Sequence, residues 1–171
     1  NSQKPEDLEA ATEAMQKFRP YLRYIDTQRM IEDLASGEIC LAVGYNGDML
    51  QARSRAIETK TGQNIAYIIP KEGSIIWFDS YLIPKDAPHP KNAHAFINYM
   101  LKPEVIAAVS NFTNYANGNS AAGQFVNKEV LEDPGVYPSA DVKSKLVPDL
   151  ADTEETTRIM TRGWTRFMTG K

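Results

Sequence analysis

The sequence predicts an α/β protein, and three observations support this fold class. Residues 21–69 alternate strand, helix, strand, helix and strand patterns. The segment Glu38–Gly44 is apolar enough to be buried on both faces, as strands of a parallel sheet are. Apolar residues then recur at helical spacing through most of residues 91–169.

The chain opens with a predicted helix over Pro5–Phe18. Proline suits the first helical position, and the acidic residues of the first turn favour the positive end of the helix dipole. Pro20 ends this helix, and Tyr21–Ile25 is predicted as a short strand. A second helix follows through Ala35 and closes at Gly37.

Three more strands and one helix complete the predicted sheet region. Glu38–Gly44 leads into a helix over Asp48–Lys60. Asn64–Ile69 is the next strand, and Ser74–Ile83 is a long apolar strand interrupted by Asp79.

The second half of the chain is predicted to be helical around one small, polar loop, Thr113–Gly123. This β-rich first half and helical second half make a lopsided domain, which suggests missing partner structure. The predicted helices cover Lys91–Leu101, Pro103–Phe112, residues near Val126–Leu131, Ala140–Lys145 and Asp152–Thr169.

Composition excludes some classes of function. The net charge is −3, from 19 Lys and Arg against 22 Asp and Glu, which argues against a nucleic-acid-binding protein. Cys40 is the one cysteine, so no internal disulfide is possible, and its apolar neighbours predict a small buried side chain. No stretch reaches the roughly 20 apolar residues of a membrane span. The chain opens without Met, and we interpret its start as a boundary within a longer protein.

Asp79 is the sharpest anomaly in the sequence. A carboxylate within Ile75–Ile83 is costly to bury without a cation or hydrogen-bond donors. Strand alternation places Asp79 on one face with Trp77 and Tyr81. Asp79 therefore either binds a cationic ligand, or points to solvent or pairs with an arginine.

A second candidate site lies where the Glu38–Gly44 strand meets the next helix. Asp48 follows this strand end, where ligands bind in open α/β sheets, although an acid in a first helical turn also simply stabilises the helix. Tyr45, Trp77 and Tyr115 are aromatic residues near these acids or in the polar loop. Aromatic faces attract ammonium groups, but each ring could equally belong to the core.

Catalytic and metal motifs do not emerge from the sequence. His89 and His94 lack metal-ligand spacing, and there is no phosphate-binding glycine loop or nucleophile elbow. We therefore predict no catalytic residues, no metal and no cofactor.

Six motifs, in this order and at this spacing, resemble the bacterial polyamine-binding proteins of ABC importers. The motifs are Ile39-Cys-Leu-Ala-Val-Gly-Tyr-Asn-Gly-Asp48, Ile69-Pro-Lys-Glu-Gly73, Trp77-Phe-Asp79, Asn114-Tyr-Ala-Asn117, Asp133-Pro-Gly-Val-Tyr-Pro138 and Arg162-Gly-Trp-Thr165.

This resemblance implies the type II periplasmic-binding fold, two α/β lobes joined by a hinge, with the N-terminal half missing. Residues 1–70 would belong to the second lobe, 71–115 would return to the first, and 116–171 would pack back toward the second. The resemblance further implies a ligand-binding site made by five residues. These are Tyr45, Asp48, Trp77, Asp79 and Tyr115, with Tyr45 standing where the family usually has Trp.

The implied function is capture of putrescine or spermidine in the periplasm for the permease subunits of an ABC transporter, without insertion into the membrane. Alternatives are a polyamine sensor for a membrane receptor, or a solute-binding protein for another small cation. An enzyme that uses Asp48 and Asp79 as an acid–base pair has only those two acids in its favour.

Overall fold

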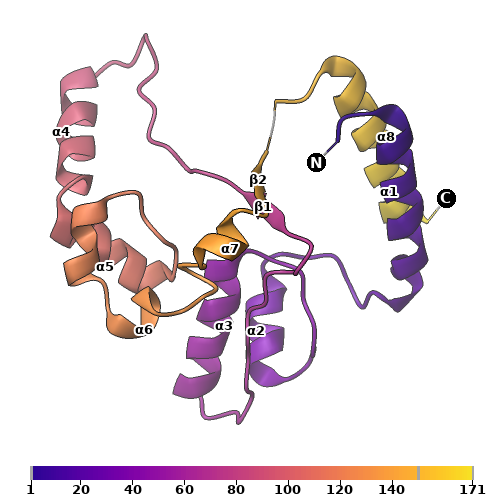
Figure 1. Cartoon of the computed structure of the whole chain (residues 1–171), viewed down its shortest axis with the longest axis horizontal. Coiled ribbons are helices and arrows are strands. Elements are labelled where there is room, and N and C mark those ends of the chain that lie inside the picture. The colour runs from indigo at the N-terminus through magenta and orange to yellow at the C-terminus, as the bar shows by residue number, and fades with distance from the viewer. Residues whose placement is uncertain (1, 150, 171) are drawn as a thin grey trace. The chain divides into compact units, whose positions relative to one another are not determined.

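The computed structural model describes residues 2–149 and 151–170, and most of its regular structure is helical (Figure 1). The helices are α1 Pro5–Phe18, η1 Arg19–Tyr21, α2 Arg29–Ser36, α3 Asn46–Glu58, α4 Pro90–Met100, α5 Pro103–Thr113, η2 Ser120–Phe125, α6 Lys128–Leu131, α7 Ala140–Lys143 and α8 Glu154–Thr169, where η marks a 3₁₀ helix. The strands β1 Ser74–Ile76 and β2 Leu146–Pro148 pair into a two-stranded sheet.

The chain divides into two compact units. Unit 1 consists of Asn1–Asp26 and Val147–Lys171, and unit 2 consists of Thr27–Leu146. In unit 1, α1 and α8 lie side by side and are joined at Arg19, whose guanidinium donates hydrogen bonds to the carbonyls of Phe167 (2.5 Å) and Met168 (2.8 Å). A cation at these last carbonyls of α8 also complements the helix dipole.

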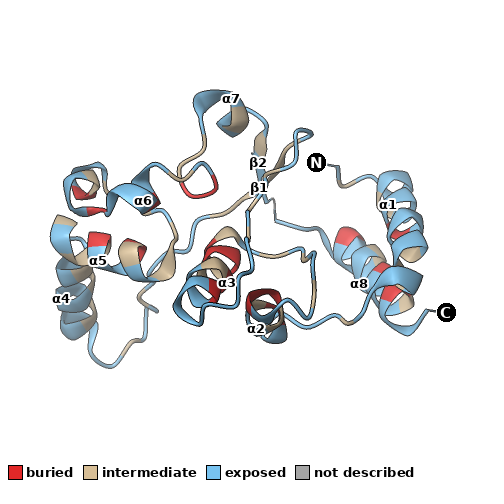
Figure 2. Cartoon of the chain, turned by 90° about the horizontal axis from the view of Figure 1, so that it is seen from below, coloured by how far each residue is buried: buried red, intermediate tan, exposed pale blue. Residues whose placement is uncertain are grey.

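Unit 2 is organised around α3, and its buried residues concentrate on α2, α3 and α5 (Figure 2). Leu50 of α3 belongs to one apolar cluster, with residues of α5, η2 and α6. Met49 and Ala52 belong to a second cluster, with residues of α2. Because α3 is buried from both sides, its first turn is held in a fixed place.

The predicted helices are confirmed, with boundaries shifted by a few residues. Pro5 and Pro103 stand at the starts of α1 and α5, as predicted. Gly37 closes α2 in the left-handed conformation (φ 84°), which a side chain would strain.

The strand predictions were largely wrong. Residues 21–25, 38–44 and 64–69 form no strand, and the predicted strand Ser74–Ile83 ends at Ile76. A strand needs a neighbouring strand to form its backbone hydrogen bonds. In the described residues, only β1 and β2 form such a pair. Side chains that a parallel sheet would bury are accordingly exposed, among them Leu41 (84%), Val43 (98%) and Leu82 (86%).

The prediction of a buried Cys40 was also wrong. Its side chain is exposed, because residues 38–44 form no strand and pair with no strand of the described residues. Within the described residues, no helix has the length and apolar character that a bilayer crossing requires.

Candidate functional site

A cleft of about 1010 Å³ lies within unit 2, a volume at the upper end of the range for small-molecule sites. Its walls come from β1 and the segment after it, from α4 and α5, from the loop that follows α5, and from the turn at Gly135. Three of the five predicted site residues line this cleft: Trp77, Asp79 and Tyr115.

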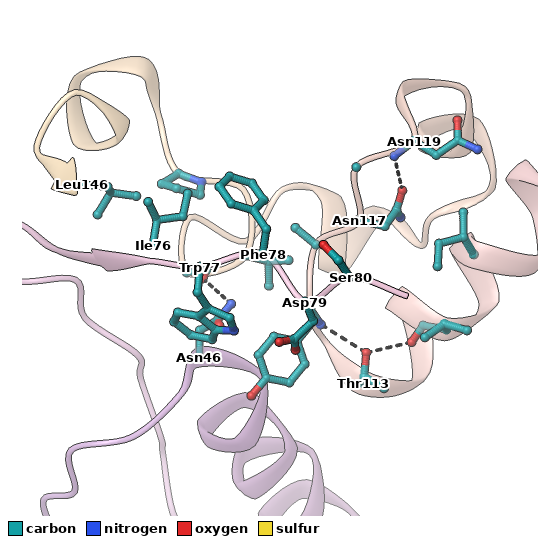
Figure 3. Close-up of a pocket in the computed structure, with 18 of the residues that line it drawn as sticks. Asn46, Ile76, Trp77, Phe78, Asp79, Ser80, Thr113, Asn117, Asn119 and Leu146 are labelled. Atoms are coloured by element: carbon teal, nitrogen blue, oxygen red, sulfur yellow. Dashed lines mark hydrogen bonds between the residues drawn. The ribbon is translucent and has the colours of Figure 1, made fainter. Parts of the chain in front are cut away.

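Trp77 and Asp79 lie in the segment that continues from β1. The backbone alternates here as an extended chain does, so Trp77 and Asp79 project to one side and Ile76 and Phe78 to the other (Figure 3). Asp79 is exposed, so its carboxylate does not bear the cost that burial in an apolar strand would impose. An exposed Asp79 needs no partner inside the protein, and its carboxylate remains accessible at the cleft wall.

Tyr45 and Asp48 are absent from the cleft lining, but each contacts a residue that lines it. Tyr45 precedes α3, and its ring meets the Trp77 ring edge-on, with centroids 4.8 Å apart and planes at 62°. Asp48 lies in the first turn of α3 and is half-buried. The Tyr115 hydroxyl donates a hydrogen bond of 3.2 Å to its Oδ1. These contacts join Tyr45 to Trp77 and Asp48 to Tyr115, and Asp79 lines the same cleft.

The loop at the end of α5 fixes Tyr115. Asn114 adopts a left-handed conformation (φ 58°) at the end of α5, and its N–H donates to the Ser110 carbonyl at 2.9 Å. Asparagine tolerates this conformation better than most residues do. Two residues past Tyr115, the Asn117 amide donates to the Ser110 hydroxyl at 2.8 Å. Tyr115 therefore sits between two anchored asparagines.

Burial raises the pKa of the Tyr115 hydroxyl above its ordinary value, and the negative charge of Asp48 and the hydrogen bond to it raise this pKa further. The phenol consequently keeps its proton to higher pH than an ordinary tyrosine, and it donates this proton in the hydrogen bond to Asp48. Burial likewise raises the pKa of Tyr67, which also lines the cleft.

Sequence reasoning missed several residues of the cleft. Asn46 lines it, and its side-chain amide donates to the Gly135 carbonyl at 3.0 Å, which ties α3 to the turn at that glycine. Asn46 and Gly47 lie between Tyr45 and Asp48 in the Ile39–Asp48 motif, so their place in the sequence could have indicated that they belong near the site. Gly135 likewise lies within the Asp133–Pro138 motif, whereas nothing local in the sequence marks Tyr67.

The chemistry available at this cleft is recognition of positive charge. Carboxylates can accept charge-assisted hydrogen bonds from ammonium groups, and rings can cover an alkyl chain or a cation. Among residues 2–149 and 151–170, no three His, Cys, Asp or Glu side chains converge as metal ligands.

Comparison with known proteins identifies the family. The model of the bacterial extracellular solute-binding protein family matches residues 1–138, and the chain belongs to this family. A Listeria monocytogenes structure described as a spermidine/putrescine ABC transporter superposes with a TM-score of 0.87 at 27% identity, covering 100% of this chain and 51% of that one. The chain therefore has the solute-binding protein fold, as predicted, with more helix and fewer strands than the sequence patterns indicate.

Two curated relatives are more similar in sequence. The putrescine-binding periplasmic protein SpuD of Pseudomonas aeruginosa is 46% identical over 169 residues, which are 98% of this chain and 46% of the relative. The putrescine-binding periplasmic protein PotF of Escherichia coli is 44% identical over 172 residues, with coverage of 100% and 46%. The chain thus spans about half the length of the curated relatives it matches.

Proposed function

We propose that the intact protein captures putrescine or spermidine in the periplasm and delivers it to the permease subunits of an ABC importer. One observation carries the proposal: Trp77, Asp79 and Tyr115 line the cleft of unit 2, where Tyr45 packs on Trp77 and Asp48 accepts a hydrogen bond from Tyr115. The names of the relatives, which are putrescine-binding and periplasmic, support the same ligand class and compartment.

In the proposed mechanism, the protein binds its ligand and does no chemistry on it. Asp79 at the cleft wall and Asp48 beside Tyr115 each accept hydrogen bonds from one ammonium group. Trp77, Tyr45 and Tyr115 cover the methylene chain and the cationic ends, a contact worth about 0.5–2 kcal/mol per ring. We further propose that residues 71–115 belong to a different lobe of the intact protein from residues 1–70, and that lobe closure encloses the ligand.

Calorimetric titration of the intact protein with putrescine and spermidine tests the ligand class. We expect Asp79→Asn to weaken binding at least tenfold, about 1.4 kcal/mol, because the neutral amide cannot pair with an ammonium group. Asp48→Asn should weaken it by a comparable factor.

Asp86→Asn is the matched control, since Asp86 is exposed in the loop before α4 and does not line the cleft. Unchanged affinity in Asp79→Asn would remove Asp79 from the site. Absence of polyamine binding by the unmutated protein would refute the proposed ligand class. Loss of putrescine uptake on deletion of the gene tests the transport role separately.

A further inference from the structure

Gly47, the second residue of α3, lies in direct contact with the Tyr115 ring. A Cβ atom on Gly47 would lie 2.2 Å from Cε2, 2.4 Å from Cδ2 and 2.5 Å from Cζ of Tyr115. Such distances are far inside van der Waals contact. No side chain larger than hydrogen therefore fits at this position while the ring keeps its place.

We propose that Gly47 is a positioning residue of the binding site: the absence of its side chain lets the Tyr115 ring lie on the first turn of α3 and reach the Asp48 carboxylate. The inference rests on the proposed function in so far as Tyr115 and Asp48 bind the ligand. Gly47 itself would touch no ligand and would act through Tyr115.

The backbone cannot easily shift on either side of this contact. Gly47 is buried. Two residues that follow it, Met49 and Leu50, each belong to one of the two apolar clusters. The first turn of α3 therefore cannot shift without disturbing both clusters. The backbone that carries Tyr115 is held by the left-handed conformation of Asn114 and by the Tyr115 N–H, which donates to the Thr113 hydroxyl at 3.4 Å. A Cβ at position 47 would therefore be accommodated by rotating the Tyr115 side chain away from Asp48.

A conformational role for this glycine is not required. Gly47 has no positive φ, unlike Gly37, Gly62, Gly73 and Gly170, and it lies inside a regular helix. Alanine has a higher helix propensity than glycine, so substitution at a purely structural position of α3 would leave the helix as stable or more stable. The positioning role instead predicts lost affinity without lost helix.

The test compares two glycine substitutions in the intact protein, titrated with putrescine in a calorimeter. We expect Gly47→Ala to weaken binding about tenfold or more. The matched control is Gly123→Ala in η2, where an added Cβ meets nothing within 4 Å and affinity should stay unchanged.

A double-mutant cycle with Tyr115→Leu, which removes the aromatic ring, separates positioning from general damage. If Gly47 acts through the ring, Gly47→Ala should cost affinity only when Tyr115 is present. Wild-type affinity in Gly47→Ala, or an equal loss with and without the ring, would overturn the proposal.

A measurement that needs no ligand distinguishes failure of this inference from failure of the proposed function. The Tyr115 ring should shift the Gly47 Hα resonances and give cross-relaxation to them, and Tyr115→Leu should abolish both effects. Their absence in the unmutated protein would overturn the positioning role, even if Gly47→Ala does not fold. Their presence in a protein that binds no putrescine or spermidine would retain the contact and refute the ligand class alone.

Discussion

At the scale of single residues, the Tyr115 hydroxyl lies in surroundings that oppose its ionisation. Burial raises its pKa first, and the charge of Asp48, together with the hydrogen bond to Oδ1, raises it further. The unfolded chain releases this proton near pH 10, whereas the folded chain retains it to higher pH. Folding is therefore favoured by this group below pH 10, and the contribution is lost as pH rises through the folded pKa.

Tyr115→Phe should make the free energy of unfolding less dependent on pH above about pH 10, since it removes a phenol that ionises more readily in the unfolded chain and so favours unfolding at alkaline pH. Urea unfolding at several pH values from 7 to 11 measures this slope. Asp48→Asn removes the charge and the charged hydrogen-bond acceptor that raise the Tyr115 pKa, but it leaves the burial. The pH dependence of its free energy of unfolding should therefore lie between that of the unmutated protein and that of Tyr115→Phe. Identical slopes for the unmutated protein and Tyr115→Phe would contradict this account.

At the scale of elements, α3 is joined to the turn after α6 by a network around Asp133. Arg53 of α3 donates to Asp133 Oδ2 at 2.6 Å, while the Gly135 N–H donates to Oδ1 at 2.8 Å. Asn46 at the start of α3 donates to the Gly135 carbonyl. Only 13% of the Asp133 side chain is exposed, so water screens this ion pair weakly.

Asp133→Ala should lower the free energy of unfolding by about 1–3 kcal/mol, because it leaves the Arg53 guanidinium and the Gly135 N–H without their acceptor. Asp141→Ala is the control. Its carboxylate is 84% exposed and lies 3.9 Å from Lys145, so this change should cost less than about 1 kcal/mol. Equal losses in the two variants, measured by urea unfolding, would show that the Asp133 network stabilises the fold no more than an exposed ion pair does.

The helices were predictable from sequence, but the strands and the contacts of the site were not. Pro103 and Gly37 determine the ends of α5 and α2 through local backbone chemistry, so neighbouring residues suffice to find them. A strand such as the predicted Ser74–Ile83 depends on a partner elsewhere in the chain, and local pattern cannot supply one. The hydrogen bond from Tyr115 to Asp48 joins residues 67 positions apart, and only the family resemblance placed both in one site.

At the scale of the whole molecule, many large apolar side chains face solvent. Leu41, Val43, Ile68, Phe78 and Leu82 are each more than three-quarters exposed. Exposed apolar surface of this extent marks places where another protein segment packs, or regions prone to aggregation. The matched relatives are about twice as long as this chain, which is consistent with further residues covering these side chains.

Expressed as these 171 residues alone, the chain should therefore bind the dye ANS strongly and self-associate, because exposed apolar surface promotes both. ANS fluorescence and light scattering coupled to size-exclusion chromatography measure the two properties. The intact protein under the same conditions is the control. A monomeric 171-residue chain with no ANS signal would contradict this expectation.

The edge-on contact between Tyr45 and Trp77 gives the cleft an optical signal of its own. The sequence has two tryptophans, and the second, Trp164, lies in α8 of unit 1, with its ring 5.5 Å from that of Phe167. Once Trp164 is replaced by phenylalanine, Trp77 is the single indole emitter. Trp77 lines the cleft and its ring centroid lies 4.8 Å from that of Tyr45, so its near-ultraviolet emission should report on the cleft without an attached label.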